Sequence, residues 1–332
     1  MKSCFNAERD EMMTATNILQ AILQAEQKIR PYIRKTPLEY SHHLSKTTRS
    51  QVFLKLENLQ FTGSFKVRGA MNALLSLSKA QRDSGVVTAS SGNHGIAVAF
   101  GLNTLHINGT IFVPEDTSTA KVAAISNYEV DTRFWSTDCL ETEMHARSYA
   151  EQNDMLYISP YNNVHVVGGQ GTIGVELCQQ IKHVDVVLAA LGGGGMISGI
   201  AEYVKTVFPY TEVIGCSPEH SPVMAKSVRA GQILEMESLP TLSDGTAGGI
   251  EKEAITFPLC QRLVDDYILV SEEEIRQAMR LFIETHHMLI EGAAGVPLAA
   301  LLKTPERFQE KTVVIVLCGA NLSLETLKTV LS

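Results

Sequence analysis

Apolar and polar residues alternate along this chain in short blocks whose period switches repeatedly between that of strands and that of helices. The run at residues 184–191 is almost entirely apolar, which is typical of a strand buried on both faces of a sheet. Residues 272–288 instead repeat apolar positions at helical spacing. The alternation runs through two series, before and after residue 165, and predicts βαβ units with parallel sheets.

In the first series, a helix with Thr16 as its predicted N-cap ends near Pro31. The predicted strands then lie at 52–56, 86–89, 110–113, 131–135 and 155–159, and the predicted helices at 95–102, 119–126 and 140–152. The second series has predicted strands at 184–191, 212–216 and 312–317, and predicted helices at 172–181, 196–208, 222–230, 272–288, 293–302 and 324–331. Residues 231–256 are rich in Gly, Pro, Ser and Thr and are expected to form a long functional loop region.

We therefore expect an α/β fold with two open, twisted parallel sheets, each in its own domain. The large domain is expected to comprise residues 1–50 and 152–332, and the small domain residues 51–151. A length of 332 residues, of which 45% are hydrophobic, supports two domains with buried cores. The cleft between the domains is the natural place for a ligand.

Composition narrows the function classes. A net charge of −8 without a basic tract argues against a nucleic-acid or membrane-surface partner. No apolar run is long enough to span a bilayer, and the charged first residues do not resemble a signal peptide. The six cysteines are scattered without a Cys-x-x-Cys pair, which indicates reduced thiols and a cytoplasmic protein.

Four glycines, Gly192, Gly193, Gly194 and Gly195, stand between a predicted strand and a predicted helix. Their backbone N–H groups and the positive end of the helix would together cradle a phosphate. The alternative is a glycine turn needed only for tight packing. A dinucleotide fingerprint lacks its third glycine here, but Glu219 could still bind a ribose, so a nicotinamide enzyme remains a rival at this point.

A lysine, Lys66, lies among small residues at the start of a predicted helix, directly after Phe65. Most lysines are solvated. Here Gly63 and Gly69 permit close backbone approach, and Phe65 offers an apolar wall. A lysine desolvated in this way has a lowered pKa and can form a Schiff base with an aldehyde cofactor.

Two further motifs follow predicted strands. The first is Ser90-Ser91-Gly92-Asn93-His94-Gly95, whose hydroxyl, amide and helix N-terminal groups suit a carboxylate, although an ordinary N-cap has the same composition. The second is Cys318-Gly319-Ala320-Asn321, where the thiol either meets a ring nitrogen as a weak hydrogen-bond partner or packs as a small apolar group.

In this order and spacing, these segments resemble the fold-type-II pyridoxal-phosphate enzymes, which share the tryptophan synthase β-like fold. Within them, the chain is similar to the serine/threonine dehydratase family, which includes threonine deaminases and serine racemases. The resemblance runs from Thr36-Pro37-Leu38 to Asn321 and covers the catalytic domain. It implies that pyridoxal 5′-phosphate lies in the cleft between the two domains.

The resemblance also implies residue roles. Lys66 would form the Schiff base, and Ser91 would be a second catalytic residue. The remaining implied cofactor contacts are Phe65, Asn93, Gly192, Gly193, Gly194, Gly195, Met196, Gly245, Glu291 and Cys318. The substrate carboxylate would be held by Ser90, Ser91, Asn93 and His94. Ser217 and Val223 stand where some relatives have acidic cation ligands, so no metal is expected.

The implied reaction is α,β-elimination of a small β-hydroxy amino acid, L-threonine or L-serine, to a 2-oxo acid and ammonia. A serine racemase or a 3-hydroxyaspartate dehydratase on the same scaffold is the alternative. A nicotinamide-dependent oxidoreductase and an inactive binding protein are more distant ones. Residues 160–163 and 243–249 are expected to line the substrate pocket, with Tyr161 restricting its size. A homodimer is expected from the resemblance alone.

Overall fold

The computed structural model describes residues 18–332, so the predicted N-cap Thr16 lies outside the described part. Residues 18–29 are helical and lead into the 3₁₀ turn η1 (Arg30–Tyr32). The strands are β1 (Leu38–Tyr40), β2 (Gln51–Lys55), β3 (Val86–Ala89), β4 (Gly109–Val113), β5 (Asp131–Phe134), β6 (Leu156–Tyr157), β7 (Val186–Ala190), β8 (Glu212–Pro218), β9 (Asp266–Val270) and β10 (Thr312–Val316).

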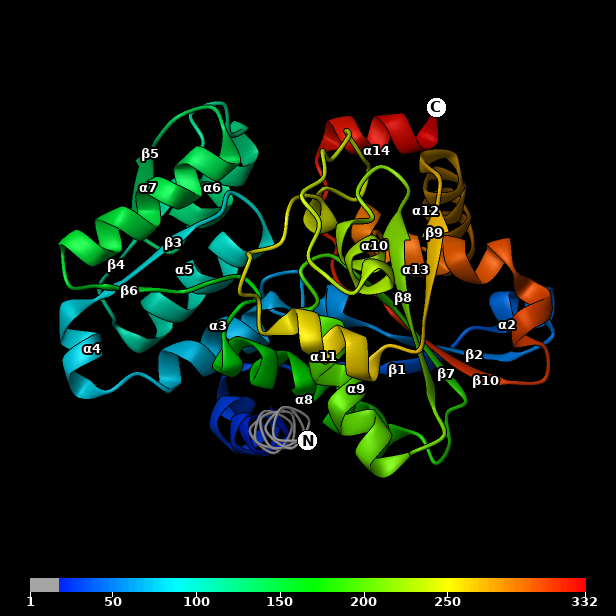
Figure 1. The fold of residues 1–332 in the computed structure, drawn as a ribbon. Helices are drawn as coiled ribbons and strands as arrows, with labels where there is room; N and C mark the ends of the chain where they lie inside the picture. The colour runs from blue at the N-terminus through cyan, green and yellow to red at the C-terminus, as the bar shows by residue number, and fades with distance from the viewer. Residues whose placement is uncertain (1–17) are drawn as a thin grey trace.

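Helices connect these strands on both sides of the sheets (Figure 1). The α-helices are α2 (His42–Thr48), α3 (Lys66–Leu75), α4 (Lys79–Ser84), α5 (Asn93–Leu105), α6 (Thr119–Ser126), α7 (Cys139–Gln152), α8 (Val164–Gln180), α9 (Gly195–Val207), α10 (Val223–Ala230), α11 (Thr256–Leu263), α12 (Glu272–His286), α13 (Gly292–Lys303) and α14 (Leu324–Leu331). The further 3₁₀ turns are η2 (Glu57–Leu59), η3 (Asp244–Thr246) and η4 (Pro305–Phe308). None of the helices within residues 18–332 is long and apolar enough to cross a membrane.

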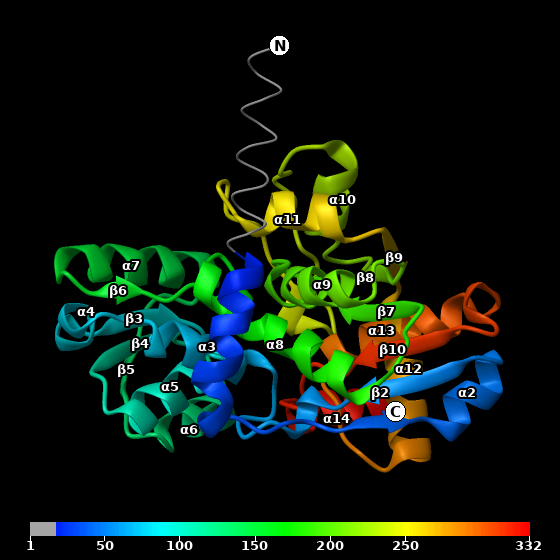
Figure 2. The same cartoon turned by 90° about the horizontal axis from the view of Figure 1, so that it is seen from below.

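The larger sheet has six strands in the order β1-β2-β10-β7-β8-β9. All neighbours run parallel except β1 and β2, which are antiparallel. The central strand β7 is buried along its whole length, as its apolar sequence predicts. Helix α13 packs against this sheet and α12 packs on α13, while α8 and α9 lie on the opposite side (Figure 2).

The smaller sheet has four parallel strands in the order β5-β4-β3-β6. Strand β4 shows how its two faces are used. Ile111 and Val113 pack with apolar residues of α5 and α6, whereas Phe112 packs on the other face with residues of α7. Alternating side chains of a strand point to opposite faces, so each face of this sheet has its own helical cover.

Helix α8 lies where the two parts of the chain meet, and its glycines let other helices approach its backbone. A Cβ atom on Gly169 would lie 2.5 Å from the carbonyl oxygen of Arg68 in α3. A Cβ atom on Gly199 of α9 would lie 2.6 Å from the carbonyl oxygen of Val167 in α8. The backbones of α3 and α9 therefore contact α8 almost directly, which real Cβ atoms at these positions would prevent.

The fold agrees with the expected α/β class and with its two mostly parallel sheets. The predicted helix at 172–181 begins earlier, at Val164, and the predicted strand at 155–159 shrinks to β6. The expected domain boundaries at residues 51 and 151 do not match the sheets. Strand β2 belongs to the six-stranded sheet because its partner is β10, and β6 belongs to the four-stranded sheet beside β3.

Candidate active site

Lys66 is the first residue of α3, and the segment before it is fixed by the segment that follows β10. The Phe65 N–H donates to the carbonyl oxygen of Cys318 at 3.0 Å, and Ser64 forms a bridge with Gly319. Gly63 adopts a φ of 71°, which glycine accommodates without strain. These contacts fix the position of the Lys66 backbone, from which its side chain extends.

The amino group of Lys66 is enclosed by protein. Its Nζ donates to the carbonyl oxygen of Pro160 at 3.1 Å and lies 5.3 Å from the centre of the Phe65 ring. Burial lowers the pKa of this amine to about 8, against the opposing pull of Cys318 and Glu291. A much larger fraction of Lys66 is therefore a neutral, nucleophilic amine near pH 7 than for an exposed lysine.

The four-glycine turn joins the carboxyl end of β7 to the N-terminus of α9. Gly194 has a φ of 83°, and a Cβ atom on Gly193 would lie 2.5 Å from the Tyr161 ring. The first-turn N–H groups of a helix have no acceptor within the helix. In this chain the free N–H groups of the first turn of α9 follow directly on three glycines, which have no side chains to block a ligand. This is the arrangement of a phosphate site.

The Ser90–His94 segment connects the carboxyl end of β3 to α5. The Ser90 hydroxyl oxygen accepts the Gly92 N–H at 3.2 Å, and Asn93 begins the helix. A Cβ atom on Gly95 would lie 2.0 Å from the Ser90 carbonyl oxygen, so the turn is as tight as glycine permits. Ser91 stands half-buried in this turn, beside the N-terminus of α5.

His94 is buried, and its Nε2 lies 3.0 Å from the carbonyl oxygen of Ile158. Burial lowers the pKa of His94 to about 3, and the nearby Lys66 amine adds to the effect. The imidazole is therefore neutral at pH 7. Nε2 carries the proton toward the carbonyl, and Nδ1, which has no partner among the described residues, is an acceptor.

Glu291 is a buried carboxyl group at the start of α13, and it joins the two parts of the molecule. The Asn93 Nδ2 donates to both of its oxygens, at 2.8 and 2.9 Å. The Asn321 N–H donates to Oε2 at 3.1 Å, and the Cys318 thiol lies 3.9 Å from Oε1. Burial raises the pKa of Glu291 to about 7, with Asp244 adding to the shift, so the carboxyl group is poised between its two charge states.

The predicted segments form one continuous circuit of contacts. Pro160 receives the Lys66 amine, and the next residue, Tyr161, packs on Gly193. A Cβ atom on Gly192 would meet the backbone of Thr246 at 2.9 Å, and one on Gly245 would lie 3.8 Å from a Glu291 oxygen. Glu291 then contacts Asn93 and Cys318, and Cys318 returns to Phe65.

Sequence comparison gives the family of this circuit. A family model described as "Pyridoxal-phosphate dependent enzyme" matches residues 29–319. The chain belongs to the pyridoxal-phosphate-dependent enzymes. The match includes Lys66, the Ser90–His94 turn, the four-glycine turn, Glu291 and Cys318, and the cofactor of this family is pyridoxal phosphate.

Individual members of this family are also similar to the chain. An L-threonine ammonia-lyase of Geobacter sulfurreducens is 37% identical over 310 residues, covering 93% of this chain and 77% of the relative. The processed form of threonine deaminase isoform 2 from Solanum lycopersicum superposes with a TM-score of 0.91 at 30% identity, covering 96% and 92% of the two chains. Maize serine racemase superposes with a TM-score of 0.87 at 29% identity, covering 94% and 96%.

The residues present fit pyridoxal phosphate. The site offers a buried amine for its aldehyde and a glycine cradle at a helix N-terminus for its phosphate. The buried Ser64 hydroxyl and the His94 Nδ1 have no hydrogen-bond partner among the described residues. Buried polar atoms are normally partnered, so two such atoms beside Lys66 indicate a site built around a polar ligand. The thiol of Cys318 is kept neutral because burial raises its pKa well above the usual value.

Other predicted residues lie at the margin of the circuit. Met196 is buried in the first turn of α9. Glu219, weighed earlier as a ribose ligand, lies 3.5 Å from Lys303 at the surface. Ser217 donates to the Leu191 carbonyl oxygen, and no metal-binding group of three or more His, Cys, Asp or Glu side chains exists within residues 18–332.

Sequence reasoning missed one member of the site and one contact of Lys66. Asn321 donates through Nδ2 to the Asn93 Oδ1 at 2.7 Å and to the Thr62 carbonyl oxygen at 2.8 Å, so it connects three of the segments. The sequence signal for Asn321 was its position at the end of the motif Cys318-Gly319-Ala320-Asn321. Pro160 belongs to residues 160–163, which were expected to line the substrate pocket, but its carbonyl oxygen was not predicted as the partner of Lys66, because that contact depends on how the chain returns from β6.

Proposed function

We propose that this chain is a pyridoxal-phosphate-dependent ammonia-lyase that converts a small β-hydroxy amino acid, L-threonine or L-serine, into a 2-oxo acid and ammonia. The observation that carries the proposal is the buried Lys66 amine, with its pKa at about 8, close enough to the turn at the N-terminus of α5 to lower the pKa of His94. The similarity to an L-threonine ammonia-lyase over most of both chains supports this substrate class.

When bound, pyridoxal phosphate supplies an aldehyde that bonds covalently to an amine and a conjugated ring that draws electrons from the substrate Cα. The chain's own groups supply the rest. Gly192–Gly195 and the α9 N-terminus hold the phosphate. The N–H groups at the start of α5, with Ser90 and Ser91, hold the substrate carboxylate and orient its Cα–H bond toward Lys66.

Lys66 is the general base in this proposal. As a neutral amine it removes the Cα proton, and its burial keeps it neutral in a useful fraction of molecules. Hydroxide leaves from Cβ and takes up a proton to become water. Water later replaces the nitrogen at Cα, so the net change is amino acid to 2-oxo acid plus ammonia. His94 and Cys318 are both uncharged at neutral pH, because burial lowers the pKa of the imidazole and raises the pKa of the thiol. Neither side chain therefore adds a charge to the site.

The first test is a visible spectrum of the purified protein, followed by separate additions of L-threonine, L-serine and L-threo-3-hydroxyaspartate. We expect an absorbance band near ~410–420 nm from the linked cofactor, and a rate of 2-oxo acid release that differs among the three substrates. Lys66→Ala should lose both the band and the turnover. A variant that keeps turnover would rule out Lys66 as the base.

A serine racemase is the second candidate, and the similarity to maize serine racemase favours it. Racemisation needs a proton donor on the face of Cα opposite Lys66, and Ser91 is the proposed donor. A chiral assay of the serine remaining after partial turnover separates the two activities. Accumulation of D-serine that Ser91→Ala abolishes would favour the racemase.

We further propose that the two sheets belong to two domains and that the chain acts in the cytoplasm as a homodimer. The five described cysteines form no disulfide, which agrees with a reducing compartment. The dimer rests on family resemblance. Light scattering on the purified holoenzyme should give twice the mass of 36.3 kDa, and a monomeric mass would contradict it.

A further inference from the structure

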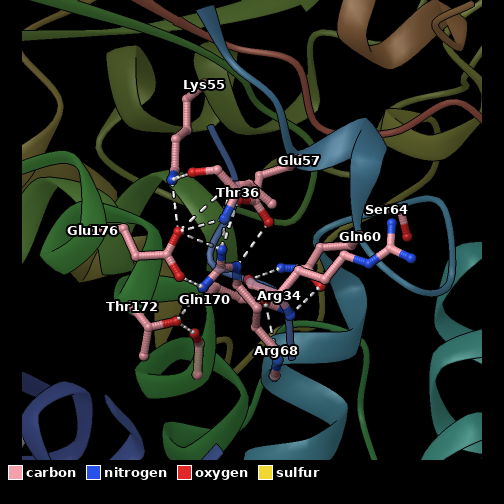
Figure 3. A network of polar contacts seen from close by, with 12 residues as sticks. Arg34, Thr36, Lys55, Glu57, Gln60, Ser64, Arg68, Gln170, Thr172 and Glu176 are labelled. Carbon is pink, nitrogen blue, oxygen red and sulfur yellow. Dashed lines mark hydrogen bonds and ion pairs between the residues drawn. The ribbon is translucent and has the colours of Figure 1, made fainter. Parts of the chain in front are cut away.

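Arg68 lies two residues after Lys66 on α3, and its side chain is completely buried. Figure 3 shows the polar contacts of its guanidinium group. Its Nε and Nη2 donate to the two oxygens of Glu57 at 2.7 and 2.8 Å. Its Nη1 and Nη2 donate to the two oxygens of Glu176 at 2.8 and 2.9 Å. Nη1 also donates to the Thr172 hydroxyl at 3.1 Å. The planar fork of arginine is thus held from two sides.

Lys55 is the second buried cation of this network. Its Nζ donates to Glu176 Oε2 at 2.6 Å and to the carbonyl oxygen of Thr36 at 2.8 Å. The Thr36 hydroxyl in turn donates to Glu57 at 2.5 Å. The basic partners lower the pKa of Glu176 to about 2, so it is ionised at neutral pH. Two buried cations therefore balance two buried carboxylates.

The partners of Arg68 all lie on the side of the six-stranded sheet. Glu57 begins η2, which follows β2, and Glu176 and Thr172 are in α8. On its other flank, α3 contacts α5, which begins at the carboxylate-binding turn. The Lys66 helix is thus fastened by ion pairs to the part of the chain that carries the phosphate turn, and only packed against the other part.

The geometry of α3 directs the side chains of Lys66 and Arg68 to different sides of the helix. Residues two positions apart on an α-helix point about 200° apart. When Arg68 points into the network, Lys66 must therefore point away from it, toward Pro160. Any rotation or sliding of α3 would break several of the bonds of Arg68, because its donors are fixed in one plane.

We propose that Arg68 is a positioning residue for Lys66: its paired bonds to Glu57 and Glu176 set the rotation and height of α3, and so hold the Lys66 amine at a fixed distance from the cofactor phosphate site. This inference rests on the proposed cofactor role of Lys66. Buried ion pairs add little net stability compared with apolar packing, so their position next to the lysine calls for another reason.

The matched control is Lys55. Lys55→Met and Arg68→Met each remove one fully buried cation from Glu176, but only Arg68 lies on α3. A third variant, Arg68→Lys, keeps the charge and loses the planar fork. For each purified variant, the melting temperature, the affinity for added pyridoxal phosphate and the rate at which the ~410–420 nm band forms are measured at a temperature where circular dichroism shows a folded protein.

We expect Arg68→Lys to bind the cofactor phosphate within threefold of wild type, but to form the band at least tenfold more slowly. Lys55→Met should lose a comparable or larger part of the melting temperature while the band forms within twofold of the wild-type rate. If the rates of the Arg68 and Lys55 variants fall together in proportion to stability, or if neither falls, Arg68 has only a structural role and the proposal is overturned.

The same experiment separates this inference from the proposed function. A wild-type protein that forms no band, or a Lys66→Ala variant that still forms one, refutes the proposed role of Lys66 and the positioning role with it. A wild-type band that depends on Lys66 and is insensitive to Arg68→Lys refutes the positioning role alone. If Arg68→Met does not fold, Arg68→Lys against Lys55→Met still decides the question.

Discussion

The Glu291 carboxyl group has its pKa raised to about 7, from an ordinary value of 4.5, chiefly because it is buried. A folded-state pKa above the unfolded one means that the folded protein binds the proton more tightly. The contribution of this group to stability is therefore most favourable below pH 4.5, and it worsens as the pH rises toward 7.

Glu291→Gln should remove that penalty while keeping the size of the side chain and one acceptor for Asn93. We expect the free energy of unfolding of the cofactor-free variant, relative to wild type, to improve by on the order of 2 kcal/mol between pH 5 and pH 8. Denaturant titrations at the two pH values measure this. The exposed Glu306→Gln is the control and should show no such difference, and an equal response of both variants would contradict the prediction.

The pKa of Lys66 makes a second prediction at the residue scale. Only the neutral amine attacks an aldehyde, so the initial rate of band formation in cofactor-free protein should rise with pH and level off above about 8. Rates measured from pH 6 to pH 10 test this. A rate that keeps climbing toward the pKa of an ordinary lysine would show that the amine is not desolvated.

Single residues stood out in the sequence where their chemistry was unusual for their surroundings, and their roles stay predictions. A lysine between small residues and four consecutive glycines stand out in any sequence, and the structure places them in one circuit. The interactions of Glu291 with Asn93 and Asn321 were not predictable, because they join residues about 200 and 30 positions apart through side-chain rotamers. The buried charges of Lys55, Glu57 and Glu176 gave no sequence signal either.

Among the elements, α8 is a helix of 17 residues that nevertheless contains four glycines, all of them buried at its contacts with other helices. These glycines allow close packing of the helices, because added Cβ atoms would clash with the backbone of neighbouring helices. They are not there to make α8 flexible. Gly169 is the clearest case, since its Cβ atom would meet both the carbonyl oxygen of Arg68 and, at 2.6 Å, the Cα atom of Gly69.

Gly169→Ala should therefore destabilise the protein, although alanine favours a helix by about 1 kcal/mol. Overpacking of this kind typically costs about 1–3 kcal/mol, so we expect a net loss of stability together with displacement of α3. Gly249→Ala is the control because a Cβ atom there meets nothing within 4 Å and its backbone lies outside the left-handed region. Thermal unfolding that gives Gly169→Ala an unchanged or higher midpoint would contradict the prediction.

Strands and helices with strong periodicity were predicted close to their observed bounds, such as α12 and β10. The short elements α2, α4 and β1 were not, because a few residues carry too little periodic signal, and α11 and β9 were missed as well. The membership of β2 was misassigned for a different reason. A parallel strand finds its neighbour through long-range pairing, and β2 pairs with β10 some 260 residues later.

At the scale of the molecule, two ion pairs join the four-stranded part to loops of the six-stranded part. Lys121 of α6 lies 3.3 Å from Asp244 of η3, and Arg147 of α7 lies 2.9 Å from Glu251. Glu251 has further partners. It accepts from Asn162 at 2.8 Å, and its N–H donates to the hydroxyl of Tyr161, whose ring packs on the four-glycine turn.

Glu251→Gln should loosen this connection. Because the pair is partly exposed, we expect a stability change of only about 0–1 kcal/mol. We expect a severalfold rise in the dissociation constant of pyridoxal phosphate, since Tyr161 supports the phosphate turn. A double-mutant cycle with Arg147→Met measures the coupling in cofactor affinity, with the ion pair of Lys205 and Asp265, which lies outside these loops, as the control pair. Strictly additive effects at Arg147 and Glu251 would contradict the prediction.

The pairing of residues 63–65 with residues 318–320 has a consequence for protein synthesis. Ribosomes release the N-terminal part of a chain first, and domains fold as their residues become available. Here the backbone that presents Lys66 takes its partners from the end of the last strand. During synthesis, Lys66 therefore emerges long before residues 318–320, which contact the backbone beside it. The folded surroundings of Lys66 can therefore form only after residues 318–320 have left the ribosome.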